Sequence, residues 1–380
     1  MKVDELIEKD AYSMPSSEKQ TLFLEAMKES IRFHYNNCNE FKNYLDYLKF
    51  DINSEYSLED LPYLPIPIFK EMELITGSKE DIKTTINSSS TTSNKPSKIP
   101  LDKITMKRQQ IALKNIMSSY LGKERRIFII FDKKSTIENR GQNTSSRASA
   151  ILGMLPFAKS MKFVLNDDLE FDMELFKEAI DSISSSNNDD RESGEKIKIC
   201  FFGFTWIIYK TYLSIRKDLK KLEQFRILIK ELSRLSNDKK VLHIGGWKKL
   251  KEIAVEKSQF NNEIGMITNV DIKEIIDFYG MTEQLGTVYP DCEEGYKHAS
   301  LYSEIIIRDQ NTLLPLEVGK AGLIQLITPL PNSYPGISIL TEDVGELIGI
   351  DNCKCGRKGK YFIFKKRVEK APIKGCGDTL

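Results

Sequence analysis

The sequence has almost no excess charge of either sign, because 56 Lys and Arg residues balance 55 Asp and Glu residues and leave a net charge of +1. A near-neutral chain without a basic stripe argues against nucleic-acid binding. Long apolar runs are absent too, since the longest, ICFFGFTWIIY at 199–209, is about half the length that a membrane span requires. The opening MKVDELIEKD lacks the apolar segment of a secretory leader. These absences predict a cytoplasmic protein with no membrane span.

Cysteine and histidine are also scarce, with six and three residues. Without a secretory leader, the cysteines are expected as thiols for metal binding or chemistry rather than as disulfides. Two short segments, CEEGYKH and CKC, contain Cys292, His298, Cys353 and Cys355. These four ligands suffice for a closed tetrahedral Zn²⁺ site. The alternative is that the tight C-x-C spacing holds no metal and that His298 is a surface residue.

Short apolar runs alternate with helix-like segments through the middle of the chain. RRIFIIF at 125–131, KIKICFFGF at 196–204 and KVLHIGG at 240–246 are typical of buried strands. Amphipathic stretches such as 207–235 separate them, and this alternation predicts an α/β layered fold. From about residue 301, runs such as SEIIIRD and YFIFKKR follow one another without long helices, which indicates a mainly β subdomain.

We therefore expect three parts in the chain. An α/β core over 1–300 includes N-terminal helices within 16–48, a β-rich subdomain covers 301–370, and a tail covers 371–380. LPYLPIPIFK at 61–70 is expected to run extended, because each proline disfavours helix in the residue before it. SISSSNNDDRESGE at 182–195 is expected to be a solvated loop, by composition.

A polar tract, INSSSTTSNKPSK at 86–98, is the first candidate for a binding site. Its hydroxyl groups and backbone N–H groups provide many donors for a phosphate chain. The tract lacks the glycines and lysine of a P-loop, so composition alone favours a plain surface loop. The residues concerned are Ser88, Ser89, Ser90, Thr91, Thr92 and Ser93.

Two segments near strand ends carry further candidates. HIGGWKK at 243–249 places Gly245 and Gly246 where a planar ligand approaches the backbone closely, although an ordinary turn explains the pair equally well. TEDVG places Asp343 beside a turn after a strand, where a carboxylate accepts both hydroxyls of a ribose.

The segment YGMTE at 279–283 combines a glycine, a hydroxyl and a carboxylate. Gly280 allows close approach, Thr282 offers a hydrogen bond to a phosphate oxygen, and Glu283 offers a hard oxygen ligand for Mg²⁺. A capped turn is the alternative interpretation of the same residues.

Taken in order, LPYLPIPIFK, SSSTTSNKPSK, HIGGWKK, LTEDVG and FIFKKRVEKAPIKGCGD resemble the adenylate-forming enzymes. Within that superfamily they resemble the acyl-protein synthetases of bacterial luciferase fatty acid reductase complexes, over almost the whole chain. The resemblance implies a large adenylate-forming domain of layered α/β sheets with a mainly β subdomain. It also implies that the C-terminal lid domain of other adenylating enzymes is absent or truncated, because few residues follow Arg367.

The resemblance also assigns roles to individual residues. It implies that Ser88 to Ser93 bind phosphates, although Ser90 and Ser93 stand where the family has glycines. It implies that Thr282 meets the α-phosphate and that Arg367 lies at the hinge between the two domains of the superfamily. The other implied contacts to ATP and Mg²⁺ come from Gly245, Gly246, Tyr279, Gly280, Glu283 and Asp343.

The activity implied is ATP-dependent formation of acyl-AMP from a fatty acid, followed by acyl transfer to a cysteine and then to a partner acyl reductase. The family carries its acyl group on a cysteine near the C-terminus, and Cys376, between two glycines, matches it. Lys370 and Lys374 are close in sequence, and nearby cations favour the thiolate. Gly203 and Phe204 are weak candidates for the acyl channel, against a plain core strand. An acyl- or aryl-CoA ligase of the phenylacetate-CoA ligase type and a catalytically degenerate nucleotide-binding scaffold are the alternatives.

Overall fold

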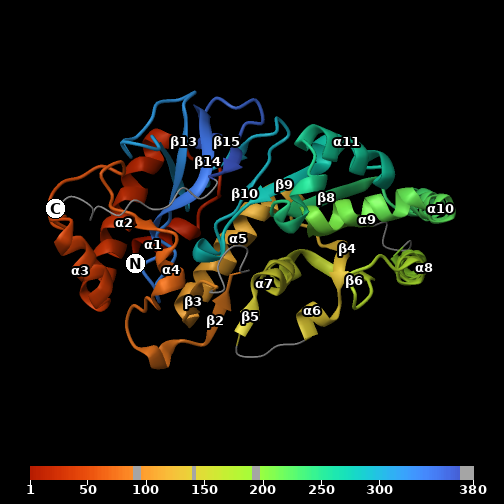
Figure 1. The fold of residues 1–380 in the computed structure, drawn as a ribbon, viewed down its shortest axis with the longest axis horizontal. Helices are drawn as coiled ribbons and strands as arrows, with labels where there is room; N and C mark the ends of the chain where they lie inside the picture. The colour runs from red at the N-terminus through yellow and green to blue at the C-terminus, as the bar shows by residue number, and fades with distance from the viewer. Residues whose placement is uncertain (89–95, 139–142, 191–196, 369–380) are drawn as a thin grey trace.

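The computed structural model describes residues 1–88, 96–138, 143–190 and 197–368, with backbone alone for residues 143, 144, 186–190, 248, 249 and 251. Three sheets organise the described chain, and helices cover them in layers (Figure 1). A mainly parallel sheet and an antiparallel sheet lie side by side, and a small sheet lies beside them. The sequence therefore predicts the α/β class correctly.

The parallel sheet has the strand order β10-β9-β8-β7-β4-β6, with only β10 antiparallel to its neighbour. Its central strands are continuous apolar runs because helices cover both faces. Alternate residues of β4 belong to different cores, since Ile127 and Ile129 pack in one and Phe128 and Ile130 in the other. The bounds are β4 Arg126–Lys133, β6 Ala158–Leu165, β7 Lys198–Phe204, β8 Asp238–Ile244, β9 Ile275–Tyr279 and β10 Tyr289–Pro290.

Helices cover the two faces of this sheet unequally. Helices α8 Met173–Asp190, α9 Thr205–Lys217, α10 Leu219–Leu235 and α11 Lys257–Thr268 pack on one face. The long helix α5 Lys103–Leu121 and helix α7 Ser146–Leu152 pack on the other. Asp102 caps the N-terminus of helix α5, because its side chain accepts a 2.6 Å hydrogen bond from the Thr105 backbone N–H. It passes between the two large sheets and joins their cores.

The antiparallel sheet has the order β11-β15-β14-β13-β12, and β1 pairs parallel to β14. Its strands are β1 Leu64–Pro65, β11 Lys297–His298, β12 Glu304–Arg308, β13 Ala321–Ile327, β14 Ser338–Ile350 and β15 Lys360–Arg367. The four longest strands coincide with the apolar runs that follow residue 301, so that part of the sequence prediction is confirmed. Strands β1 and β11 join the same sheet from outside 301–370, and the division into domains stays a prediction.

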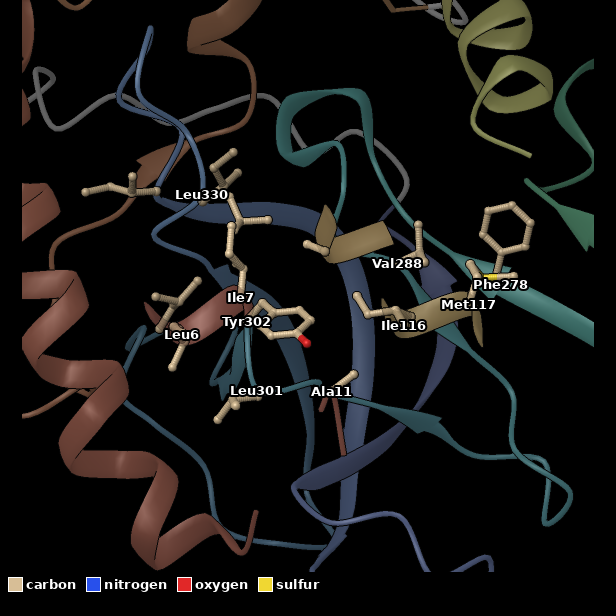
Figure 2. Close-up of a cluster of buried hydrophobic side chains, with 14 of the residues drawn as sticks. Leu6, Ile7, Ala11, Ile116, Met117, Phe278, Val288, Leu301, Tyr302 and Leu330 are labelled. Atoms are coloured by element: carbon tan, nitrogen blue, oxygen red, sulfur yellow. The ribbon is translucent and has the colours of Figure 1, made fainter. Parts of the chain in front are cut away.

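The first three helices of the chain pack against this sheet (Figure 1). They are α1 Lys2–Ile7, α2 Ser16–Asn37 and α3 Asn39–Tyr47. The N-terminal segment bonds to distant parts of the chain, since Ala11 O accepts from Leu301 N at 2.7 Å and Tyr12 O accepts from Lys358 N at 3.0 Å. Figure 2 shows Leu6, Ile7 and Ala11 of this segment among buried side chains that come from helix α5, strand β9 and the antiparallel sheet region.

The third sheet, β3-β2-β5, consists of β2 Thr84–Asn87, β3 Lys98–Leu101 and β5 Asn143–Ser145. Strands β2 and β3 are antiparallel and flank the polar tract. The remaining short helices are α4 Ile68–Glu71, α6 Ser135–Glu138 and the 3₁₀ turns η1 Lys79–Asp81, η2 Leu155–Phe157, η3 Lys248–Ile253, η4 Ile272–Glu274 and η5 Thr282–Gln284.

Two local predictions are wrong. Helix α8 continues through Asp190, where composition indicates a loop over 182–195, and residues 191–195 of that range lie outside the described residues. Ser185 is compatible with the helix because its Oγ donates to the Asp181 carbonyl at 2.9 Å. The segment 61–70 is not extended throughout, because Ile66 and Pro67 form a turn and helix α4 begins at Ile68.

Candidate active site

Three of the candidate residues meet where the two large sheets adjoin. Tyr279 ends β9, Asp343 lies in β14, and Arg367 ends β15 as the cross-strand partner of Asp343. The Tyr279 hydroxyl donates to Asp343 Oδ2 at 2.8 Å, and Arg367 Nε donates to Asp343 Oδ1 at 2.9 Å. The ring of Phe364 stacks on Tyr279, with 5.8 Å between centroids. The structure thus brings together residues from strands that are distant in the sequence.

Burial and the charge of Asp343 both shift the pKa values of Tyr279 and Arg367. The Asp343 side chain is 5% exposed, whereas the Arg367 side chain is 60% exposed. Burial raises the pKa of Tyr279 well above its usual value, and the neighbouring Asp343 carboxylate adds to the effect. Burial acts to lower the pKa of Arg367, but its hydrogen bond and ion pair with Asp343 raise it overall. The tyrosine therefore stays a neutral donor, and the carboxylate retains lone pairs that a ligand hydroxyl can use.

Glu283 lies in the turn η5 and is 4% exposed. Burial raises the pKa of its carboxyl group, while Ser97 and the charge of Lys70 act in the opposite direction. It forms no salt bridge with any residue in the described ranges. Its backbone is anchored, because Tyr334 Oη donates to the Glu283 carbonyl at 2.9 Å. Thr282, next to it, is half-buried. A fixed, buried carboxylate that forms no ion pair with the described residues is suited to a cation ligand.

Ser97 is the residue that sequence reasoning missed here. It is fully buried, and its hydroxyl lies close enough to the Glu283 carboxyl group to favour the ionised carboxylate. It also closes the polar tract, because Ser97 N donates to Ser88 Oγ at 2.9 Å and Ser88 N donates to the Ser97 carbonyl at 3.0 Å. The two ends of the tract therefore meet beside Glu283. Ser89, Ser90, Thr91, Thr92 and Ser93, between these ends, lie outside the described residues.

Gly245 and Gly246 follow strand β8 and are exposed. Gly245 has φ of +81°, and a Cβ there would lie 3.3 Å from the ring of Phe204. Gly203 is packed more tightly, because a Cβ would lie 2.9 Å from Phe131 Cβ. Phe204 itself is 7% exposed within the core beneath α9. Packing explains Gly203 and Phe204, and their role in an acyl channel stays a prediction. A Cβ on Gly280 would lie 3.4 Å from Val288, so this glycine lies in ordinary contact.

The four metal-ligand candidates also come together. Cys292, His298, Cys353 and Cys355 each offer a ligand atom, and these atoms lie within 4.8 Å of one another. Cys292 Sγ is 3.8 Å from Cys353 Sγ, and Cys355 Sγ is 3.4 Å from His298 Nε2. His298 is fully buried, so the interpretation as a surface residue is wrong.

A second buried group of charges escaped sequence reasoning. Lys297 is 5% exposed, and its Nζ lies 3.0 Å from Asp277 Oδ2 and 3.2 Å from Asp291 Oδ1. Asp291 also pairs with Lys257 at 2.8 Å. The only signal in the sequence was the charged Asp277 inside the apolar run IIDFY of β9. These ion pairs fasten strands β9, β10 and β11 to one another.

Comparison with known proteins gives a consistent result. The sequence matches the family described as "Acyl-protein synthetase, LuxE" over residues 1–380. A Vibrio harveyi protein named long-chain-fatty-acid–luciferin-component ligase is 22% identical over 364 residues, which cover 94% of this chain and 87% of that protein. An Aliivibrio fischeri protein of the same name is 23% identical over 324 residues, which cover 84% of this chain and 77% of that protein.

Among solved structures, an open conformation of 2-hydroxyisobutyryl-CoA ligase with 2-HIB-AMP and CoA superposes with a TM-score of 0.67 at 12% sequence identity. The match covers 94% of this chain and 76% of that one. The likeness shows that the α/β fold resembles the fold of this ligase. Cys376 lies outside the described residues. Within the described ranges, no helix has both the length and the apolar character needed to cross a bilayer.

Proposed function

Because the chain belongs to the LuxE acyl-protein synthetase family, we propose that it is an ATP-dependent ligase that activates a long-chain fatty acid as acyl-AMP. The acyl group then passes to Cys376 as a thioester and on to a partner acyl reductase, which forms the aldehyde. The observation that carries the proposal is the family match over the whole chain. The cluster of Tyr279, Asp343 and Arg367 supports it, as do the ends of the polar tract, which meet beside Glu283.

In the first step, a fatty acid carboxylate oxygen attacks the α-phosphorus of ATP. A new oxygen–phosphorus bond forms, and the bond from the α-phosphorus to the bridging oxygen breaks, so that its electron pair leaves with pyrophosphate. Negative charge grows on the phosphoryl oxygens, and fixed donors such as Thr282 and the hydroxyls of the polar tract stabilise it. Gly245 and Gly246 border the adenine, and Asp343 accepts the ribose hydroxyls while Tyr279 and Arg367 hold its carboxylate in place.

The residues around Glu283 fit a Mg²⁺ ion, because the carboxylate is buried, forms no ion pair with the described residues, and has the Ser97 hydroxyl beside it. When bound, the ion neutralises phosphate charge. Glu283 holds its carboxylate toward that site, and the turn η5 keeps it there through Tyr334.

In the second step, the thiolate of Cys376 attacks the acyl carbon of acyl-AMP. A carbon–sulfur bond forms and the carbon–oxygen bond to the phosphate breaks, which releases AMP. The thiol proton leaves to solvent before attack, and Lys370 and Lys374, close in sequence, favour the thiolate.

The proposal is tested by incubating the protein with ATP, Mg²⁺ and a set of fatty acids and recording its intact mass. We expect a mass gain that matches one acid, that hydroxylamine removes, and that Cys376→Ser abolishes. Cys38→Ser is the matched control, because Cys38 is a buried thiol far from the tail in sequence and should leave the adduct unchanged. An adduct that survives in Cys376→Ser would contradict the assignment of that cysteine.

A diffusible acceptor is the second candidate, since the superposed 2-hydroxyisobutyryl-CoA ligase holds CoA. Acid-dependent pyrophosphate release without a protein adduct, together with acyl-CoA formation when CoA is added, would favour a CoA ligase. Neither adduct nor pyrophosphate, from protein that binds ATP, would favour a degenerate nucleotide-binding scaffold.

A further inference from the structure

The four residues of the Cys/His cluster come from two separate hairpins. Cys292 follows β10 and His298 lies in β11, whereas Cys353 and Cys355 lie in the turn between β14 and β15. Each hairpin presents its ligands from a tight turn, because Cys292 N donates to the Tyr296 carbonyl at 2.8 Å and the Cys353 carbonyl accepts from Gly356 N at 3.1 Å. Two independently built turns thus present ligands to one point.

The separations match a tetrahedral metal centre. A zinc–sulfur bond of about 2.3 Å and a zinc–nitrogen bond of about 2.0–2.1 Å place two sulfurs about 3.8 Å apart and a sulfur and a nitrogen about 3.6 Å apart. The observed Cys292 Sγ to Cys353 Sγ distance is 3.8 Å, and the Cys355 Sγ to His298 Nε2 distance is 3.4 Å. The widest separation within the cluster is below 4.8 Å, so the remaining pairs need to close by about 1 Å at most.

The surroundings suit a cluster of thiolates. Three thiolates around a divalent ion carry one net negative charge, and the guanidinium of Arg357 interacts with Cys355. Arg357 is itself held by Glu293, at 2.6 Å, and by the Ser119 carbonyl of α5, at 2.8 Å. The ring of Tyr361 stacks on His298, with 5.4 Å between centroids, and fixes the plane of the imidazole. Outer contacts of this kind orient metal ligands.

We propose that Cys292, His298 Nε2, Cys353 and Cys355 bind one Zn²⁺ ion as a closed structural centre that fastens the β10–β11 hairpin to the β14–β15 turn. Zinc is favoured because three thiolates and one imidazole in a tetrahedral arrangement leave no open position for a substrate. Metal binding at these residues does not depend on the proposed ligase activity.

The position of the centre gives it a defined structural effect. Strand β10 pairs with β9, where Tyr289 is the partner of Tyr279, and β11 pairs with β15. Strands β14 and β15 carry Asp343 and Arg367. The ion therefore ties the β10–β11 hairpin to the turn between the two strands that carry Asp343 and Arg367.

The test is the metal content of the full chain, purified without an affinity metal or chelator and measured by elemental mass spectrometry. We expect one zinc per chain, and replacement by Co²⁺ should give the thiolate-to-metal charge-transfer absorption of a tetrahedral site. Cys353→Ser and Cys355→Ser should lose most of the metal, while Cys38→Ser, outside the cluster, should keep it.

A variant that fails to fold would lose metal for a trivial reason, so Cys355→His supplies a second measurement. This change keeps a ligand atom, and we expect folded Cys355→His to retain zinc with an altered Co²⁺ spectrum. Purified wild-type protein without zinc, an iron ion in its place, a Cys292–Cys353 disulfide, or full zinc in Cys353→Ser would each overturn the proposal.

Discussion

Two buried glutamates differ in their lysine partners, and this difference predicts opposite effects of a Glu→Gln substitution on the free energy of unfolding. Glu283 is 4% exposed and forms no salt bridge in the described ranges, whereas the Glu304 side chain is 6% exposed and pairs with Lys19 at 3.1 Å and with Lys360 at 3.7 Å. A buried polar group left unsatisfied costs about 1–3 kcal/mol, and more when charged. Removing one partner of a buried ion pair costs about 3–5 kcal/mol.

We therefore expect Glu283→Gln to raise the free energy of unfolding by about 1–3 kcal/mol at pH 8, in buffer without Mg²⁺ or ATP. Glu304→Gln should lower it by about 3–5 kcal/mol, because Lys19 is left buried without a carboxylate. The measurement is urea unfolding followed by far-ultraviolet circular dichroism. Both variants replace a carboxylate with an amide of nearly the same volume, so side-chain packing changes little in either variant.

The free energy of unfolding should depend on pH in opposite ways at the two glutamates. Burial raises the folded-state pKa of Glu283, so the native state loses stability as pH rises from the ordinary carboxyl range through the folded pKa. The gain in Glu283→Gln should therefore be small near pH 4 and complete at pH 8. Burial acts to raise the pKa of Glu304, but Lys19 and Lys360 lower it overall, so its contribution is present above the ordinary range and is lost as pH falls.

The reasoning fails if Glu283→Gln destabilises the protein at pH 8 as Glu304→Gln does. That result would mean that the Glu283 carboxylate has a stabilising partner. Addition of Mg²⁺ and ATP provides a further check on the proposed function, since ligand should stabilise the wild type more than Glu283→Gln.

Two further predictions concern neighbouring charges. Asp343→Asn should weaken ATP binding roughly 100-fold, because two charge-assisted hydrogen bonds of about 1.5 kcal/mol each are lost. Calorimetric titration measures the affinity for ATP, and Glu342→Gln on the same strand should change that affinity little. Lys297→Met should lower the free energy of unfolding by about 3–5 kcal/mol, since it removes the Lys297 partner of the buried Asp277 and Asp291 carboxylates and leaves Asp291 with Lys257 alone. Unfolding as stable as the wild type would show that solvent compensates for the lost ion pairs.

Much of the fold was predictable because it rests on local patterns. The runs that became β4 and β7 are apolar over most of their length, as strands covered on both faces must be, and β8 is apolar at Val241, Leu242 and Ile244. The end of α8 was not predictable from composition, because serine hydroxyls bond to helix carbonyls as well as to water. The two-residue strands β1 and β11 have no pattern of their own and depend on β14 and β15.

The site was predictable only in part, for a related reason. Tyr279, Asp343 and Glu283 stand out because polar groups beside apolar strands are costly unless they are used. Ser97 carries no such mark, since a serine near a polar tract is unremarkable until the fold places its hydroxyl beside Glu283. The Cys/His ligands were visible as residue types, but their approach within 4.8 Å depends on the pairing of β11 with β15.

The contacts of the N-terminal segment also bear on how the chain folds as it is synthesised. Ser16 N donates to Asp351 Oδ2 at 2.9 Å, and Lys19 Nζ donates to the Ser303 carbonyl at 2.6 Å. The first helices therefore have no complete partner surface until the last strands have left the ribosome. Contacts of such long sequence separation slow folding and leave apolar faces open in the meantime. During synthesis, the apolar faces of α1 and α2 therefore stay without these contacts of the native fold.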